Sequence, residues 1–145
     1  MSYLGDFKLG DTLDLKFCTV NTTGAPTQLA GGPAIAAYPA NNAVEVTAGI
    51  TLSVDFDSLT GLNNVRIVAT AANGYAAATN YALVITAGTV GGTSVVGYVV
   101  AHFSVENRSA AGASAVWEEL EASHVASGTF GRRVGHGIKI QQSIG

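Results

Sequence analysis

The sequence predicts an all-β protein with one domain-sized core, and three observations support this prediction. Between residues 11 and 106, short segments show alternating apolar and polar side chains, which is the pattern of strands with one buried face. Turn-forming Gly, Pro and Asn residues separate these segments, for example at 21–26 and 71–74. The chain has 145 residues, which is enough for one core without metals or disulfides.

The strand pattern recurs at residues 12–20, 33–38, 50–56, 62–70, 81–87 and 95–106. In the last of these segments both faces are largely apolar, so we expect that strand to be covered on both sides. About seven short strands separated by turns indicate an immunoglobulin-like antiparallel β-sandwich, although the Cys…Trp…Cys signature of true immunoglobulin domains is absent. The expected core consists of Leu13, Leu15, Phe17, Leu52, Val54, Phe56, Ile67, Leu83, Ile85 and Phe103.

The periodicity changes at residues 107–112, and this change predicts two parts: a β-sandwich domain at 1–107 and a C-terminal helix with an extended tail at 108–145. Helical spacing relates Ala113, Val116, Trp117, Leu120 and His124. A helix this short does not persist alone in water, so we expect it to dock either on its own sandwich or on another chain.

We expect the C-terminal segment to mediate assembly. Before Arg132 the chain carries four basic and ten acidic residues, a net charge of −6, whereas from Arg132 onward it carries three basic residues and no acidic one. A basic tail complements an acidic body, which in an oligomer belongs to the neighbour. The expected subunit-interface residues are Val116, Trp117, Leu120, Phe130, Arg132, Arg133, Ile138 and Ile140. The alternative is a tail that folds back on its own sandwich or has no fixed structure.

The composition favours a protein that associates with copies of itself or with partners. Only 12% of the residues are charged, 48% are hydrophobic, and the mean hydropathy is +0.32. Because Cys18 is the single cysteine, an intramolecular disulfide is excluded. We expect no secretory signal at residues 1–6, no membrane span in the apolar stretch at 95–105, and no nucleic-acid binding from three basic tail residues. The alternative is a stable monomer with an uncharged polar surface.

The inventory of reactive side chains predicts no enzyme, no cofactor and no metal site. The three histidines, His102, His124 and His136, lack zinc-type spacing. Asp55 and Asp57 form a D-x-D pair, but the Gly and Glu positions of a calcium loop are not filled. The Gly-rich residues 88–92 lack the Lys of a phosphate-binding loop.

A second class of function is a glycan-binding module that attaches to a host cell surface. Such modules present exposed aromatic side chains on sandwich loops, and the candidates are Tyr3, Tyr38 and Tyr75. Each of them is also the kind of residue that packs half-buried at a strand end. Three or more aromatic side chains on one exposed loop face would favour this class.

Several segments resemble a recurring family of bacteriophage tail and fibre-associated proteins. They are DFKLGDT at 6–12, GAPTQLAG at 24–31, LSVDFD at 52–57, AGTVGGTSVVG at 87–97, FSVENR at 103–108, AVWEE at 115–119 and HVASGTFG at 124–131. In that family the last two segments correspond to the junction between a sandwich and a helical or fibrous stalk. The first part is also loosely similar to the N-terminal domain of siphophage upper baseplate proteins.

The resemblance implies a non-enzymatic virion structural protein, in the tail, collar, baseplate or fibre attachment, that is made in the bacterial cytoplasm. Its partners would be other virion proteins and copies of itself in a homo-oligomer. The chain ends shortly after Gly131, where longer members of the family continue, which favours an adaptor over a receptor-binding tip. The alternatives are a capsid decoration protein and a host-attachment module that binds glycans.

Overall fold

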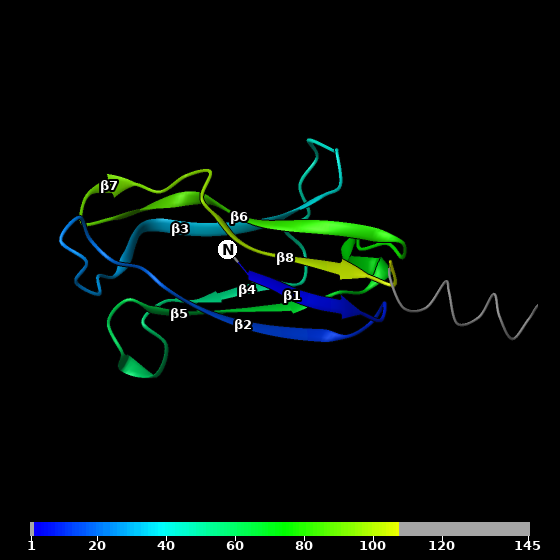
Figure 1. Cartoon of the computed structure of the whole chain (residues 1–145), viewed down its shortest axis with the longest axis horizontal. Coiled ribbons are helices and arrows are strands. Elements are labelled where there is room, and N and C mark those ends of the chain that lie inside the picture. The colour runs from blue at the N-terminus through cyan, green and yellow to red at the C-terminus, as the bar shows by residue number, and fades with distance from the viewer. Residues whose placement is uncertain (1, 108–145) are drawn as a thin grey trace, which may run out of the picture. The chain divides into compact units, whose positions relative to one another are not determined.

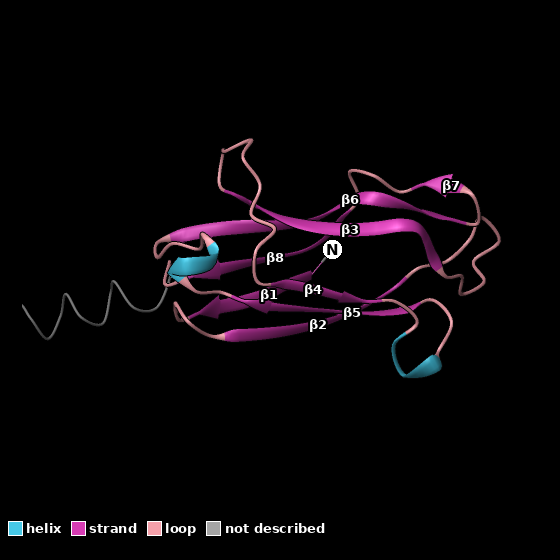
Figure 2. Cartoon of the chain, turned by 180° about the vertical axis from the view of Figure 1, so that it is seen from behind, coloured by secondary structure: helices cyan, strands magenta, loops and turns pink. Residues whose placement is uncertain are grey.

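The computed structural model describes residues 2–107, and these residues form two β-sheets (Figure 1). Strands make up most of the regular structure of residues 2–107, and the helices there are two short 3-10 turns (Figure 2). In chain order the elements are β1 (Ser2–Phe7), β2 (Thr12–Cys18), β3 (Leu29–Pro39), β4 (Ile50–Ser53), η1 (Phe56–Ser58), β5 (Leu62–Val68), η2 (Ala71–Asn73), β6 (Thr79–Val90), β7 (Thr93–Ser94) and β8 (Val99–Val105).

The two sheets lie in two layers (Figure 1). A cluster of apolar side chains from both sheets packs between them. The larger, five-stranded sheet has the order β1-β8-β6-β3, with β7 paired to β6, and the smaller sheet has the order β2-β5-β4. The pairs among these strands are antiparallel, except that β1 runs parallel to β8. The all-β prediction is confirmed.

The strands largely follow the alternation in the sequence, and β1 is the main element that the alternation did not predict. Strands β2, β3, β4, β5, β6 and β8 overlap the predicted segments. In β1, Ser2 pairs with Ala101 and Phe7 with Val105, and the register shifts between Tyr3 and Asp6. This irregular register removes the period-2 pattern that would have marked the strand.

The predicted strand at 95–106 is shorter than expected, since β8 begins at Val99. The preceding residues form a turn in which the Tyr98 N–H donates to Val95 O at 3.2 Å, and Gly97 has a φ of 87°. Few residues other than glycine adopt that backbone conformation at low cost. Within β8 itself both faces are covered, as predicted: Val100 is 9% exposed and Ser104 is fully buried.

The core lies between the sheets and contains most of the expected side chains. Leu13, Ile67, Leu83, Ile85 and Phe103 are each no more than 3% exposed. Leu15, Phe17 and Leu52 are partly buried and pack against this cluster, and Val54 is half-buried.

Three aromatic rings pack against one another within the core. The Tyr81 and Phe103 rings stack with their centroids 5.1 Å apart. Tyr75 packs against Tyr81 with a centroid separation of 5.2 Å. Rings at this separation stabilise each other beyond the effect of burial alone. Tyr75 was not expected here, because it follows an Asn-Gly turn and belongs to no alternating segment.

Phe56 was wrongly predicted to be a core residue. Its side chain is 36% exposed, and Lys16 Nζ lies 4.7 Å from the centroid of its ring. Strand β4 ends at Ser53, and Asp55, Asp57 and Ser58 all have positive φ angles. The alternation therefore continues in the sequence past the point where the backbone leaves the sheet. The predicted C-terminal helix and tail lie outside the described residues.

We expect Phe103→Ala to lower the free energy of unfolding by about 3–5 kcal/mol, because it empties a buried aromatic site. Phe56→Ala should cost less than about 1 kcal/mol, since it removes mainly an exposed contact with Lys16. Urea denaturation of the two variants beside the parent chain measures both values. Equal losses would contradict the placement of Phe56 at the surface.

Candidate functional site: an apolar groove between the sheets

The C-terminal end of β2 and the two residues that follow it form one wall of a groove between the sheets. Phe17 and Thr19 continue the inward-facing row of the strand, whereas Cys18 is exposed. Hydrogen bonds hold Thr19 in place: its Oγ1 donates to Thr27 O at 2.6 Å and accepts from Asn63 Nδ2 at 3.1 Å. These contacts give this wall a defined position.

The larger sheet supplies the opposite wall, from the second half of β6 and the turn that precedes β8. Two backbone bonds attach this turn to β6: Gly97 N donates to Ile85 O at 2.9 Å, and Ile85 N donates to Tyr98 O at 3.0 Å. Because both bonds involve Ile85, the turn holds Val95 and Tyr98 beside β6.

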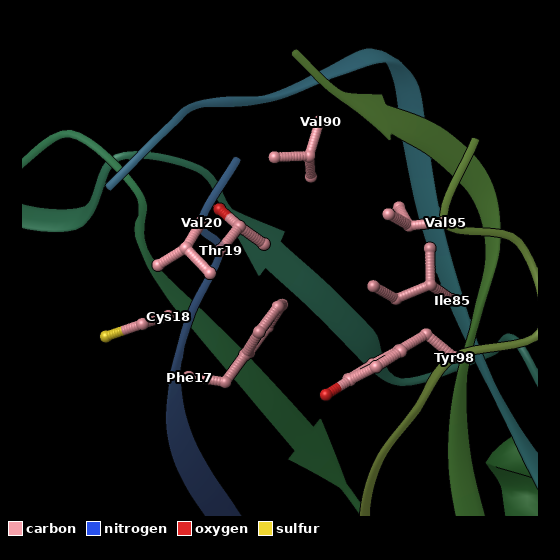
Figure 3. Close-up of a pocket in the computed structure, with 8 residues that line it drawn as sticks. All are labelled: Phe17, Cys18, Thr19, Val20, Ile85, Val90, Val95 and Tyr98. Carbon is pink, nitrogen blue, oxygen red and sulfur yellow. The ribbon is translucent and has the colours of Figure 1, made fainter. Parts of the chain in front are cut away.

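The groove has a volume of about 150 Å³, which is room for an apolar group the size of a benzene ring. Its lining residues are Phe17, Cys18, Thr19, Val20, Ile85, Val90, Val95 and Tyr98. Figure 3 shows Phe17 and Tyr98 on opposite sides of the space, while the Cys18 sulfur points away from it.

The rim of the groove leaves apolar surface in contact with water. Val20 is 51% exposed and Tyr98 is 66% exposed, and the neighbouring Val96 is 60% exposed. Single exposed apolar residues are ordinary, but several around one hollow mark a surface suited to a partner. Among the described residues no charged side chain lines the groove, so an apolar partner would meet no desolvated charge from them.

The backbone of β2 beside the groove has an unpaired outer edge. Thr19 N donates to Gly61 O at 2.8 Å, on the side of β2 that faces β5. Since the N–H and C=O groups of successive residues alternate between the two edges, those of Lys16 and Cys18 point to the other edge. Val20 follows the strand and forms an isolated bridge with Pro26 through the groups of Thr19 and Asn21, so its own N–H and C=O also point to that edge. Among residues 2–107, β5 is the one strand that pairs with β2. This edge can therefore accept an additional strand.

The outer face of the smaller sheet carries a polar ladder. Arg66 donates from Nε and Nη2 to both carboxylate oxygens of Asp14, at 3.0 and 2.8 Å. This hydrogen-bonded guanidinium holds the pKa of Asp14 below its usual value. Lys16 Nζ donates to Asn64 Oδ1 at 3.4 Å. The pairs join residues that face each other across β2 and β5, so we interpret the ladder as part of the sheet.

Asp55, the first residue of the D-x-D pair, closes a loop. Asp55 Oδ1 accepts from the Gly61 N–H at 2.7 Å, and its Oδ2 accepts from Gln28 Nε2 at 2.8 Å. Both oxygens thus have donors within the protein, as expected for a carboxylate at a strand end that enters a turn. Among the residues that the structure describes, no group of three or more His, Cys, Asp and Glu side chains is arranged to hold a metal ion.

The three tyrosines proposed for glycan binding do not share an exposed face. Tyr3 is 47% exposed, and its hydroxyl lies 2.7 Å from Ser104 Oγ. The Tyr38 hydroxyl donates to a carboxylate oxygen of Glu45. Tyr75 is only 2% exposed, and burial raises its pKa above the usual value. Two candidates for glycan binding therefore remain, Tyr3 and Tyr38, and the hydroxyl of each is hydrogen-bonded within the protein.

The groove is lined by described residues, and none of the expected subunit-interface residues is among them. Val116, Trp117, Leu120, Phe130, Arg132, Arg133, Ile138 and Ile140 all lie outside the described residues. Sequence reasoning did not identify the groove, since it joins two segments about 80 positions apart in the chain. One indication was present: Val96 and Tyr98 place apolar side chains on both sides of Gly97.

Comparison with protein-family models, with curated proteins and with solved structures found no match to this chain. Within residues 2–107, no helix has the length and apolar character needed to cross a membrane.

Two conservative substitutions in the core should have opposite effects. The Tyr81 hydroxyl accepts the Ala76 N–H at 2.8 Å, so we expect Tyr81→Phe to lower the free energy of unfolding by about 1–3 kcal/mol. Tyr75 Oη is buried with no hydrogen-bond partner in the described part of the chain, so Tyr75→Phe should leave stability unchanged or raise it. Chemical denaturation compares them directly, and an equal loss in both would show that the Tyr75 hydroxyl is paired.

Proposed function

We propose that this chain is a non-enzymatic structural component of a bacteriophage particle that joins copies of itself and other virion proteins through its C-terminal segment. The observation that carries the proposal is the apolar groove beside the unpaired edge of β2. Apolar surface and free backbone groups at one place suit the docking of another polypeptide.

The proposed module is an immunoglobulin-like β-sandwich. Strands β2, β5 and β4 take the positions of strands B, E and D in that fold, and β3, β6 and β8 those of C, F and G. A second observation supports the comparison. Tyr81, near the start of β6, accepts a hydrogen bond from the backbone of Ala76, five residues upstream, which resembles the tyrosine corner of such domains. In place of the inter-sheet disulfide, this chain has the packed rings of Tyr75, Tyr81 and Phe103.

The use of the polar side chains also supports a structural function. Asp14 pairs with Arg66 across the small sheet, Asp55 closes the loop before β5, and Asp6 connects β1 to β8. Each of these carboxylates holds one part of the fold to another. Hydrogen-bonded carboxylates of this kind stabilise a scaffold, and their oxygens are not directed into the groove.

The location in a phage particle rests on the resemblance of segments such as residues 6–12 and 87–97 to tail and fibre-associated proteins. A module of low charge with a docking edge suits a protein that is surrounded by neighbours in an assembly. The tail, collar, baseplate and fibre attachment are all compatible with these features. Mass spectrometry of purified particles of the encoding phage tests the location, and absence of this chain from them would refute it.

We expect deletion of residues 108–145 to leave a folded domain that no longer assembles. The two sheets and the aromatic core lie within residues 2–107, so the remaining chain keeps its stabilising contacts. Sedimentation velocity of the full and shortened chains measures assembly, and far-ultraviolet circular dichroism checks that both are β-rich. A shortened chain that still forms the same oligomer would contradict the proposed connector.

A further inference from the structure

We propose that residues 134–144 of a second copy of this chain dock in the groove as an added strand, paired with the outer edge of β2. This inference rests on the proposed function, because it names the surface that receives the connecting segment. The acceptor is built from described residues, and the donor is identified from its sequence pattern.

The acceptor offers both of the contacts that strand addition needs. The outward N–H and C=O groups of Lys16, Cys18 and Val20 supply the hydrogen bonds, and the groove supplies a place for apolar side chains. Strand β1 does not cover this region, since it begins opposite Ala101 in the larger sheet, whereas the groove is lined by Val95 and Tyr98. The space beside the end of β2 is thus open among the described residues.

Residues 134–144 match this acceptor in their alternation. The sequence reads VGHGIKIQQSI. Four of its six even-numbered positions hold β-branched residues, Val134, Ile138, Ile140 and Ile144, and the other two hold His136 and Gln142. The odd-numbered positions are small or polar: Gly135, Gly137, Lys139, Gln141 and Ser143. A strand with one apolar and one polar face fits a groove that is apolar toward the core and open to water outside.

The positions of the last described residue and of the groove favour a second copy as the source of the strand. Asn107, the last described residue, donates its N–H to Asp6 Oδ1 beside the end of β8, whereas the groove lies next to the start of β8. Figure 1 shows β7 and the end of β8 at opposite ends of the two layers. A donor that leaves at one end and an acceptor at the other end produce head-to-tail contacts, which generate rings or filaments.

The charges agree with this arrangement. Residues 2–107 contain seven acidic and three basic residues, a net charge of −4, and residues 132–145 contain three basic and no acidic residues. The basic segment of one copy would thus approach the acidic body of the next. This attraction favours association between copies and weakens as salt is added.

Cys18 provides a test in the full-length protein, because it is the only cysteine, is exposed and lies on the outer face of β2. A strand added beside β2 would bring its odd-numbered side chains next to Cys18, at a spacing that a disulfide can bridge. We expect Lys139→Cys, Gln141→Cys or Ser143→Cys to give a covalent dimer after mild oxidation. The register decides which of the three variants reacts best.

Gln142→Cys is the matched control for Gln141→Cys. It makes the same chemical change at the next position, where the side chain faces the groove, so we expect little cross-linking. Adding Cys18→Ser to the reactive variant should abolish the covalent dimer, which separates the proposed bond from one between two tail cysteines. Non-reducing electrophoresis at a range of protein concentrations measures all of these outcomes.

The other possible results of the cross-linking experiment each contradict a different part of the inference. No bond to Cys18 from any odd position rules out pairing at β2, and equal cross-linking of the Gln141 and Gln142 variants rules out the alternation. An intramolecular bond assigns the strand to its own chain. Sedimentation of the reduced parent chain keeps the proposed function separate: an oligomer without the cross-link refutes only this inference, whereas a monomer at all concentrations refutes the proposed function.

A second variant tests the groove without a cysteine. Val20→Asp places a charge at the exposed rim, whereas Val44→Asp makes the same change at a side chain that is 71% exposed and does not line the groove. We expect the first variant to shift the oligomer toward monomer and the second to leave it unchanged. Equal behaviour of the two variants would contradict docking at the groove.

Discussion

The pairing of β1 with β8 is the contact on which the arrangement of the two sheets depends. It joins residues about 100 positions apart, and polar bonds reinforce it: Ser104 Oγ contacts both Tyr3 and Asp6, and Asp6 also accepts the Asn107 N–H. Because β1 belongs to the larger sheet, the smaller sheet has only β2, β5 and β4. The outer edge of β2 therefore has no partner within residues 2–107.

This edge and the groove beside it have a common origin. A fourth strand in the smaller sheet would cover Phe17 and Val20 and pair the outward backbone groups of β2. No such strand occurs among residues 2–107, which leaves their apolar side chains and hydrogen-bonding groups exposed at one place. Proteins normally avoid such edges because they promote association. An assembly protein uses the same feature as a binding site, and the alternating segment at 134–144 has the composition to fill it.

Local alternation predicted most strands, and eight of the ten expected core residues lie in or against the core, because a strand with one buried face carries that information in its own residues. It failed where the structure depends on distant contacts. Phe56 continues the alternation of β4 but lies beyond the end of the strand, in a loop whose backbone turns to positive φ. Strand β1 is held by β8, Tyr75 enters the core from a loop, and the groove requires β2 to meet the turn at 95–98. None of these relations is visible in a window of neighbouring residues.

The most direct test of the account is amide hydrogen exchange along β2, measured by NMR or by residue-resolved mass spectrometry in dilute and in assembled protein. Strand addition should slow the exchange of the outward amides of Lys16, Cys18 and Val20. The amides of Leu15, Phe17 and Thr19 already face β5 and serve as internal controls, so their exchange should change little. If the protein assembles while the three outward amides exchange as fast as in the dilute sample, the edge of β2 is not the site of assembly.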